Sequence, residues 1–197
     1  MKKIILAALC TIMFIGCTQQ PKTMENPVFN NIMTRVSVRQ FTGEPITQAQ
    51  VDTLLRAGMA APSALNHQPW AFVVVTDAAV LDRIAEALPY SRCGNGAACA
   101  IVPCGDLSKA IEGAGRDFWI NDVSAAAENI LLAAHSMGLG AVWTGVHPGQ
   151  ERVDALRGIL NLPEQIIPLC IIPVGHPAEQ PAVKDKYNED NIHYNKW

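Results

Sequence analysis

The stretch Ala61–Trp70, APSALNHQPW, decides how this chain is interpreted, because it joins a helix-like run to a strand-like run. Residues 46–59 before it have helical spacing, and Ala71–Thr76 after it, AFVVVT, is typical of a buried strand. Its polar side chains are Ser63, Asn66, His67 and Gln68. Small-molecule sites are commonly built from polar loops on a rigid scaffold, so the stretch indicates either such a site or an ordinary connection.

The helix-like run before this loop has a clear beginning and end. Thr47 and Gln50 have the spacing of a capping box, in which two side chains satisfy free backbone N–H groups at the helix start. Val51 and Leu54 repeat at helical spacing, and Pro62 ends the helix. The pattern therefore predicts a helix over residues 46–59 that leads into the polar loop.

The N-terminal residues indicate export. Lys2 and Lys3 precede an apolar run, Ile4–Ile15, which has the length of a signal peptide and is short for a transmembrane helix. Gly16 and Cys17 follow, and a small residue before cysteine resembles the lipobox of bacterial lipoproteins. We therefore expect a lipidated Cys17 and a protein anchored to a membrane on the periplasmic side of the cell envelope. A plain secretory signal is one alternative, and a cytoplasmic protein with a misread N-terminus is another.

The rest of the chain has the size of one domain. A signal peptide at 1–16 and a polar tether at 17–26 leave residues 27–197, enough for a sizeable core. Without the two signal-peptide lysines, 13 basic and 18 acidic residues remain, and the formal charge is near −5. This balance argues against nucleic-acid binding and provides no basic patch for a membrane.

The cysteines do not indicate a metal site. Cys93, Cys99, Cys104 and Cys170 lack C-x-x-C spacing and have no histidine cluster beside them, which argues against zinc. In an exported protein Cys93 can pair with Cys99 or Cys104, but the spacing does not decide whether such a disulfide forms.

A second polar pattern lies in Thr34–Phe41, TRVSVRQF. If this segment is extended, its period of two places Arg35, Ser37 and Arg39 on one face. Two guanidinium groups and a hydroxyl on one face suit a phosphate, which arginine binds through two hydrogen bonds. A solvated edge strand is the alternative.

The remaining chain alternates between strands and helices with irregular connections. Strands are expected at 98–104, 140–145 and 166–174, helices at 77–88, 120–137 and 153–160, and a polar tail at 182–197. No G-x-G-x-x-G follows a strand, so a dinucleotide-binding Rossmann fold has little support. The pattern predicts an α+β fold with a mixed central β-sheet flanked by helices.

Four stretches in order give the chain a resemblance to a known family. TRVSVRQF, APSALNHQPWAF, GLGAVWTG and the tail KDKYNEDNIHYNKW together resemble the FMN-dependent nitroreductases, over about residues 28–197. The resemblance implies that family's α+β fold and a homodimer with FMN at the subunit interface, with the tails wrapped around the partner. It also implies a role for each matching residue. The implied FMN-binding residues are Arg35, Ser37, Arg39, Pro62, Ser63, Asn66, Gln68, Trp143, Thr144 and Gly145, with Lys184 or Lys186 reaching the phosphate.

The resemblance also implies an activity. Such an enzyme passes electrons from NAD(P)H through bound FMN to nitroaromatics, quinones or similar acceptors by a ping-pong mechanism, and the flavin carries the chemistry, so no catalytic side chain is expected. A basic residue near the ring stabilises the negative charge of the reduced flavin. Reductive dehalogenation, flavin breakdown and non-catalytic flavin binding by a lipoprotein are the alternatives.

Overall fold

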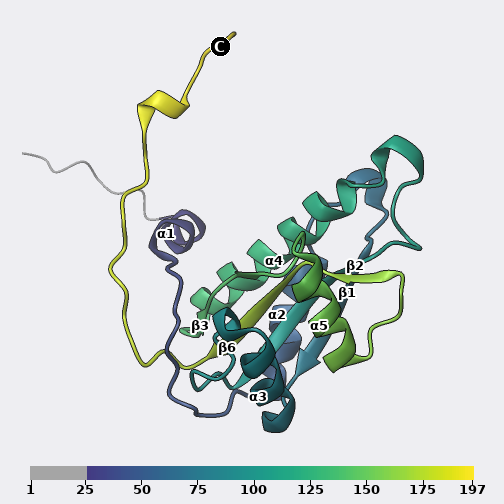
Figure 1. The fold of residues 1–197 in the computed structure, drawn as a ribbon. Coiled ribbons are helices and arrows are strands. Elements are labelled where there is room, and N and C mark those ends of the chain that lie inside the picture. Colours follow the sequence, from purple (N-terminus) through teal and green to yellow (C-terminus); the bar gives the residue numbers. More distant parts are fainter. Residues whose placement is uncertain (1–25) are drawn as a thin grey trace, which may run out of the picture.

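The computed structural model describes residues 26–197. The expected signal peptide, the lipidated Cys17 and nearly all of the tether therefore lie outside the described residues. Five α-helices and six strands form the domain (Figure 1). The helices are α1 Pro27–Thr34, α2 Gln48–Met59, α3 Ala78–Ala87, α4 Phe118–Ser136 and α5 Gln150–Leu160. The strands are β1 Trp70–Val75, β2 Cys99–Asp106, β3 Gly140–Ala141, β4 Thr144–Gly145, β5 Ile166–Pro168 and β6 Cys170–Gly175.

The central sheet has the strand order β1-β2-β6-β3, with β4 paired to β6 and β5 paired to β2. The α+β class is confirmed. All of the strand pairs in the described residues are antiparallel, however, whereas a mixed sheet was expected. The two strands expected at 140–145 and 166–174 are each divided, the first at Val142 and Trp143 and the second at Leu169.

Helices cover both faces of this sheet, and alternate residues of β2 show it. Cys99 and Ile101 pack in one apolar cluster with side chains of α2 and α4. Ala100 and Val102 pack in a second cluster with side chains of α3 and α5. Because successive side chains of a strand point to opposite faces, every residue of β2 is buried. This explains why the strand is apolar throughout rather than alternating.

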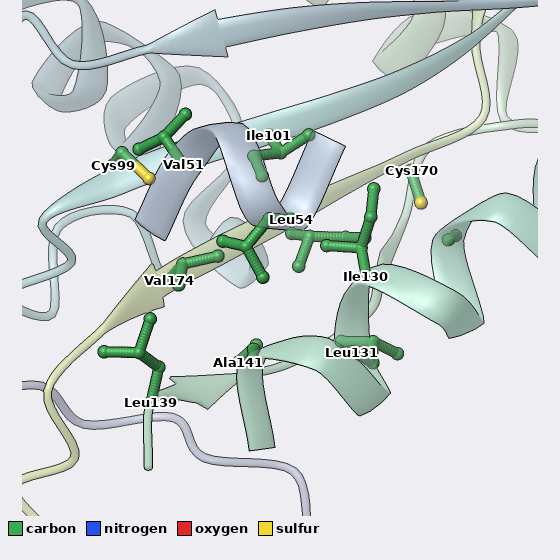
Figure 2. Packing of buried hydrophobic residues seen from close by; sticks show 13 residues of the cluster. Val51, Leu54, Cys99, Ile101, Ile130, Leu131, Leu139, Ala141, Cys170 and Val174 are labelled. Atoms are coloured by element: carbon green, nitrogen blue, oxygen red, sulfur yellow. The ribbon is translucent and has the colours of Figure 1, made fainter. Parts of the chain in front are cut away.

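Helix α4 is the longest helix and packs closely on α2 (Figure 2). Gly58 allows this approach, since a Cβ there would lie 3.1 Å from the Ile130 side chain. The Asn129 Nδ2 group donates to the Ala57 carbonyl over 3.0 Å and ties the two helices together. The long helix therefore has a fixed position against the sheet.

The predicted cap of α2 is confirmed. The Gln50 N–H donates to Thr47 Oγ1 over 3.2 Å, and the Thr47 N–H donates to Gln50 Oε1 over 2.8 Å. The pair satisfies two of the free N–H groups at the helix start, so α2 enters the core in a defined direction.

The four cysteines of the described chain are free and buried, so neither disulfide considered for Cys93 is present. Removal from water raises the pKa of the Cys93 thiol to about 11 and those of Cys99 and Cys104 to about 12. Burial also raises the pKa of Cys170. These thiols are therefore protonated core side chains at neutral pH.

Residues 26–197 contain neither a group of three potential metal-binding side chains nor a helix with the length and hydropathy needed to cross a bilayer.

Candidate functional site

The arginine-containing segment 35–41 runs beside β3 without joining the sheet. The Val38 N–H donates to the Ala141 carbonyl over 3.1 Å, and Val38 is buried. Gly140 makes this possible, because a Cβ on it would lie only 2.6 Å from Val38 Cγ1. On the other side, the Arg39 N–H donates to Glu179 Oε1 over 2.8 Å, and Asn95 Nδ2 donates to the Arg39 carbonyl over 2.8 Å. The backbone is thus held from both sides.

Helix α4 holds the beginning of this segment. Arg35 Nε lies 3.4 Å from Glu128 Oε1, and the Thr34 hydroxyl lies 2.9 Å from His135 Nε2. The Asn31 side chain donates to the Leu132 carbonyl over 3.0 Å. Burial, together with the nearby Arg35 charge, lowers the pKa of His135. These contacts place the Arg35 side chain, which is only 16% exposed, at the surface of α4.

A cavity of about 710 Å³, named here the tail cavity, lies where this segment meets α1 and the C-terminal tail. Arg35, Ser37 and Arg39 line it, as their spacing predicts, and so do Lys184 and Lys186. Its other lining residues are Ile32, Met33, Val36, Glu128 and residues 181–183 and 187. Three kinds of anion-binding group, namely guanidinium, ammonium and hydroxyl, therefore meet in one hollow, which suits a phosphate.

A second cavity, of about 450 Å³ and named here the strand cavity, lies over β4. Arg39 lines this cavity too, together with the predicted Trp143, Thr144 and Gly145. Its other lining residues are 87–92, Val142, Val146, Arg152 and Ile171. Arg39 therefore lines two cavities: the tail cavity holds two lysines and a second arginine, and the strand cavity combines apolar side chains with Arg92 and Arg152.

Strand β4, Thr144–Gly145, lines the strand cavity, and two hydrogen bonds hold it in place. The Thr144 hydroxyl donates to the Ile171 carbonyl over 2.8 Å, and Arg152 Nη1 donates to the Gly145 carbonyl over 3.2 Å. No atom lies within 4 Å of the position that a Gly145 Cβ would occupy. The backbone is therefore uncovered on its cavity side and accessible to a flat ligand.

The polar loop Ala61–Trp70 is strained and rigidly held. Leu65, Asn66 and Gln68 have φ values of 51°, 58° and 49°, which are unfavourable for residues with a Cβ. The Gln68 N–H donates to Ser63 Oγ over 2.9 Å, and Gln68 Nε2 donates to Asn66 Oδ1 over 3.1 Å. Backbone strain of this kind is concentrated at functional sites.

Helix α4 also anchors this loop. The buried Asp122 carboxylate accepts the Ala64 N–H over 2.9 Å. In the single chain, however, Pro62, Ser63, Asn66 and Gln68 line neither the tail cavity nor the strand cavity. Their assignment as flavin contacts stays a prediction. His67 is held by its own contact, with Nδ1 3.0 Å from the Lys109 carbonyl oxygen.

Two arginines of the strand cavity, Arg92 and Arg152, are not among the predicted residues. Arg92 follows a short 3-10 turn, Pro89–Ser91, and has a left-handed backbone with φ 64°. Its neighbours in the sequence carry no pattern that would reveal this orientation. Arg152 is three residues beyond the Gly149 cap of α5. Its closeness in the sequence to the GAVWTG stretch was the only indication, and a weak one, that it lies near the cavity.

The nitroreductase family model matches residues 32–91 and 90–176 of the sequence. The chain belongs to the nitroreductase family. The matched residues include segment 35–41, the polar loop and the Trp143–Gly145 stretch, but end before Lys184. The two cavities thus lie within the part of the chain that defines the family, apart from the tail.

Individual relatives support the same assignment. A Methanothermobacter thermautotrophicus protein provisionally named NADH dehydrogenase/NAD(P)H nitroreductase is 42% identical over 177 residues, covering 89% of this chain and 91% of its own. A Bacteroides thetaiotaomicron crystal structure with the same provisional name is 47% identical, with a TM-score of 0.82 and coverage of 87% and 99%. The NADPH:FMN oxidoreductase of Vibrio harveyi, complexed with NAD+, is 30% identical, with a TM-score of 0.77 and coverage of 86% and 77%.

Proposed function

We propose that this protein is an FMN-dependent oxidoreductase that takes electrons from NAD(P)H and passes them to nitroaromatics, quinones or similar acceptors by a ping-pong mechanism. The observation that carries the proposal is the position of Arg39, which lines both the tail cavity with its lysines and the strand cavity with its Trp143 side chain. FMN has the same division, with a charged phosphate at one end and a planar ring at the other.

The residues on each side of Arg39 suit these two ends. Arg35, Ser37, Lys184 and Lys186 would hold the phosphate in the tail cavity, where arginine and lysine supply charge-assisted hydrogen bonds. Trp143 and the uncovered backbone of β4 at Gly145 would bound the ring in the strand cavity.

The reaction would rest on this arrangement rather than on an acid–base pair. When bound, FMN supplies the electron and hydride chemistry. Arg39 would place a positive charge beside the ring and stabilise negative charge that develops on reduction. The apolar side chains Leu88, Val146 and Ile171 would keep water from that charge and so strengthen its interaction with Arg39.

The names of relatives agree with this proposal. One is called an NADPH:FMN oxidoreductase and was solved with NAD+, and the archaeal and Bacteroides relatives carry NAD(P)H nitroreductase in their names. An FMN-dependent nitroreductase of Clostridium difficile R20291 also has the same fold, with 26% identity and a TM-score of 0.78.

FMN binding provides the first test. We expect purified protein to hold FMN, and Arg35→Ala and Arg39→Ala each to weaken its binding about tenfold to a hundredfold, because each removes hydrogen bonds to a charged group. Arg83→Ala is the matched control, since Arg83 is exposed on α3 and lines neither cavity. Absence of FMN after reconstitution would reject the proposal, and unchanged affinity in both variants would reject the assignment of the arginines.

Turnover separates an enzyme from a flavin-binding protein. We expect NAD(P)H oxidation to increase when menadione or a nitroarene is added. FMN-loaded protein that fails to oxidise either NADH or NADPH with any acceptor would favour non-catalytic flavin binding.

The proposed assembly is a homodimer in which the polar loop of one subunit completes the flavin site of the other. Two observations support it. The loop lines neither cavity of its own chain. Large apolar side chains are also exposed on α1 and on the tail, which runs past α1 and away from the rest of the domain (Figure 1). They include Val28, Phe29, Ile32, Met33, Tyr187, Tyr194 and Trp197.

Removing the end of the tail tests this assembly. We expect the full protein to have the mass of a dimer by light scattering. A chain shortened after Tyr187 should form a weaker dimer, which dissociates at a higher protein concentration than the wild type. A wild-type monomer that binds FMN at full stoichiometry would contradict a shared site.

We further propose that the protein is a lipoprotein of the cell envelope, anchored through Cys17. Its support is the sequence alone: Lys2 and Lys3, the apolar run Ile4–Ile15 and the small residue before Cys17. Labelling with a radioactive fatty acid should mark the wild type and not Cys17→Ala. Equal labelling of both proteins, or of neither, would reject the anchor.

A further inference from the structure

The strand cavity contains more positive charge than a flavin ring requires. Arg39, Arg92 and Arg152 all line it. The ion pairs among residues 26–197 are Arg35–Glu128, Lys109–Asp106 and Arg157–Asp154. None of these involves the three arginines of the cavity, so within the described chain no carboxylate forms an ion pair with their guanidinium groups.

The backbone and the hydrogen bonds hold Arg92 and Arg152 in place. Arg92 has a left-handed backbone at the end of the Pro89–Ser91 turn, and its carbonyl accepts the Asn95 N–H over 3.2 Å. A residue with a Cβ adopts this conformation only when its surroundings impose it. Arg152 lies in the first turn of α5 and reaches across to the Gly145 carbonyl, 3.2 Å away. Both side chains line the cavity, and a hydrogen bond holds the guanidinium group of Arg152 there.

The flavin does not need the positive charges of Arg92 and Arg152. A reduced flavin ring carries at most one negative charge, and Arg39, which also borders the tail cavity, is placed to balance it. Arg92 and Arg152 line the strand cavity and not the tail cavity, so neither of them faces the phosphate end. Two guanidinium groups then remain beside the ring without a partner of opposite charge.

The cavity also offers a surface for an aromatic ring. Trp143 is assigned to the flavin ring, and Tyr90, which is 82% exposed, is a second aromatic side chain that lines the cavity. Apolar walls with a few fixed polar groups are typical of small-molecule sites. A planar molecule that carries an anionic group would match both the aromatic side chains and the unpaired guanidinium groups.

We propose that the strand cavity selects redox partners that carry a carboxylate or phosphate, and that Arg92 and Arg152 bind this anionic group. The inference rests on the proposed function, since it concerns the molecule that exchanges electrons with the flavin. The anion has two sources: a phosphate of the nicotinamide dinucleotide donor, or a carboxylate on the acceptor. Arginine binds both through paired hydrogen bonds.

The test compares charged and neutral substrates in each half of the reaction. For the donor half, reduction of the holoenzyme is followed with NADPH and with the neutral 1-benzyl-1,4-dihydronicotinamide. For the acceptor half, 4-nitrobenzoate is compared with 4-nitrobenzyl alcohol. The proteins are wild type, Arg92→Gln, Arg152→Gln and the control Arg83→Gln, whose arginine lies outside the cavity.

We expect both cavity variants to raise the KM of the anionic substrate about tenfold or more in one half of the reaction, and that of its neutral partner less than about threefold. The half that responds identifies the source of the anion. The control should behave as wild type. Equal changes for charged and neutral substrates, or no change in either half, would overturn the proposal.

A binding measurement that requires no turnover accompanies these rates. Calorimetry should show that benzoate binds wild-type holoenzyme and binds both cavity variants about tenfold more weakly, while benzamide does not distinguish them. The left-handed backbone at position 92 costs about the same free energy with Gln as with Arg, so the Arg92→Gln variant should fold. If the wild type fails to bind FMN, the proposed function fails, and the same benzoate titration on the FMN-free wild type and the two variants decides whether the anion site exists.

Discussion

Segment 35–41 and the polar loop Ala61–Trp70 both carry residues expected to contact the cofactor, yet the chain builds them in opposite ways. The segment has a buried anchor at Val38 and lines both cavities with side chains from an unstrained, extended backbone. The loop has three left-handed residues and points its side chains at neither cavity. The first is a wall of its own chain's hollow, and the second is a preformed surface directed outward.

This difference indicates that segment 35–41 serves the cavities of its own chain, whereas the polar loop serves a second molecule. A strained conformation persists only where surrounding contacts impose it, and the loop has such contacts in Asp122 and in its own Ser63 and Asn66 side chains. Holding exposed polar groups so firmly has a use when a second molecule docks on them. The comparison therefore favours a site completed by another subunit. Substitutions that release segment 35–41 or the polar loop, one at a time, test it.

The largest effect is expected from Gly140→Ala. The new Cβ would lie 2.6 Å from Val38 Cγ1 and 2.8 Å from Val38 Cβ, so segment 35–41 has to move away from β3. We expect the free energy of unfolding to fall by roughly 2–3 kcal/mol, as for other overpacked cores, and FMN affinity to fall with it. Urea unfolding and FMN titration measure the two effects.

Gly158→Ala is the control for this substitution. Gly158 lies inside α5, and nothing is within 4 Å of the position its Cβ would take. Alanine in a helix is more favourable than glycine, so the control should gain about 0.5–1 kcal/mol. If Gly140→Ala is as stable as the wild type, the contact between Val38 and Gly140 does not position the segment.

A smaller effect is expected from Asp122→Ala, which acts on the loop alone. The substitution leaves the Ala64 N–H without its buried acceptor, and we expect a loss of roughly 1–2 kcal/mol in the free energy of unfolding. Proteolysis near the exposed Leu65 should also become faster. Asp122→Asn retains an oxygen acceptor and should cleave at close to the wild-type rate. Equal cleavage of all three proteins would show that Asp122 does not hold the loop.

The smallest effect is a dependence of stability on pH through His135. Burial and the Arg35 charge lower the pKa of His135 below its usual 6.5, so the unfolded chain binds a proton more readily than the folded one. The stability that the neutral His135 contributes is fully present above pH 6.5, the usual pKa of a histidine in an unfolded chain. It is lost as the pH falls below about 6.5. We expect His135→Gln to reduce the loss of stability between pH 7.5 and 5.5. An unchanged pH profile would show that His135 does not report on segment 35–41.

The sequence predicts the locally determined parts of this structure well. The capping box of Thr47 and Gln50 and the helical spacing of Val51 and Leu54 are visible within one helix, and the structure confirms both. The period-two pattern of Arg35, Ser37 and Arg39 likewise brings these residues to one cavity. In each case neighbours in the sequence carry the whole signal.

The parts that were missed depend on distant contacts. The strand expected at 140–145 is interrupted at Val142 and Trp143, and Trp143 packs against two separate core clusters, one of which contains Trp70 and Trp119. The antiparallel strand order and the separation of the polar loop from the cavities also arise from pairings between remote residues. Arg92 lines the strand cavity and has a left-handed backbone, and nothing in its local sequence indicates either feature.

Asp122, which holds the polar loop, and Glu128, which pairs with Arg35, belong to the same helix. Glu128 lies six positions after Asp122, so the two lie about 9 Å apart along the helix axis. One residue inserted between them would turn one carboxylate by about 100° relative to the other. The spacing of Asp122 and Glu128 along α4 thus sets the position of the polar loop relative to segment 35–41. This helix should therefore tolerate substitutions far better than any change in its length.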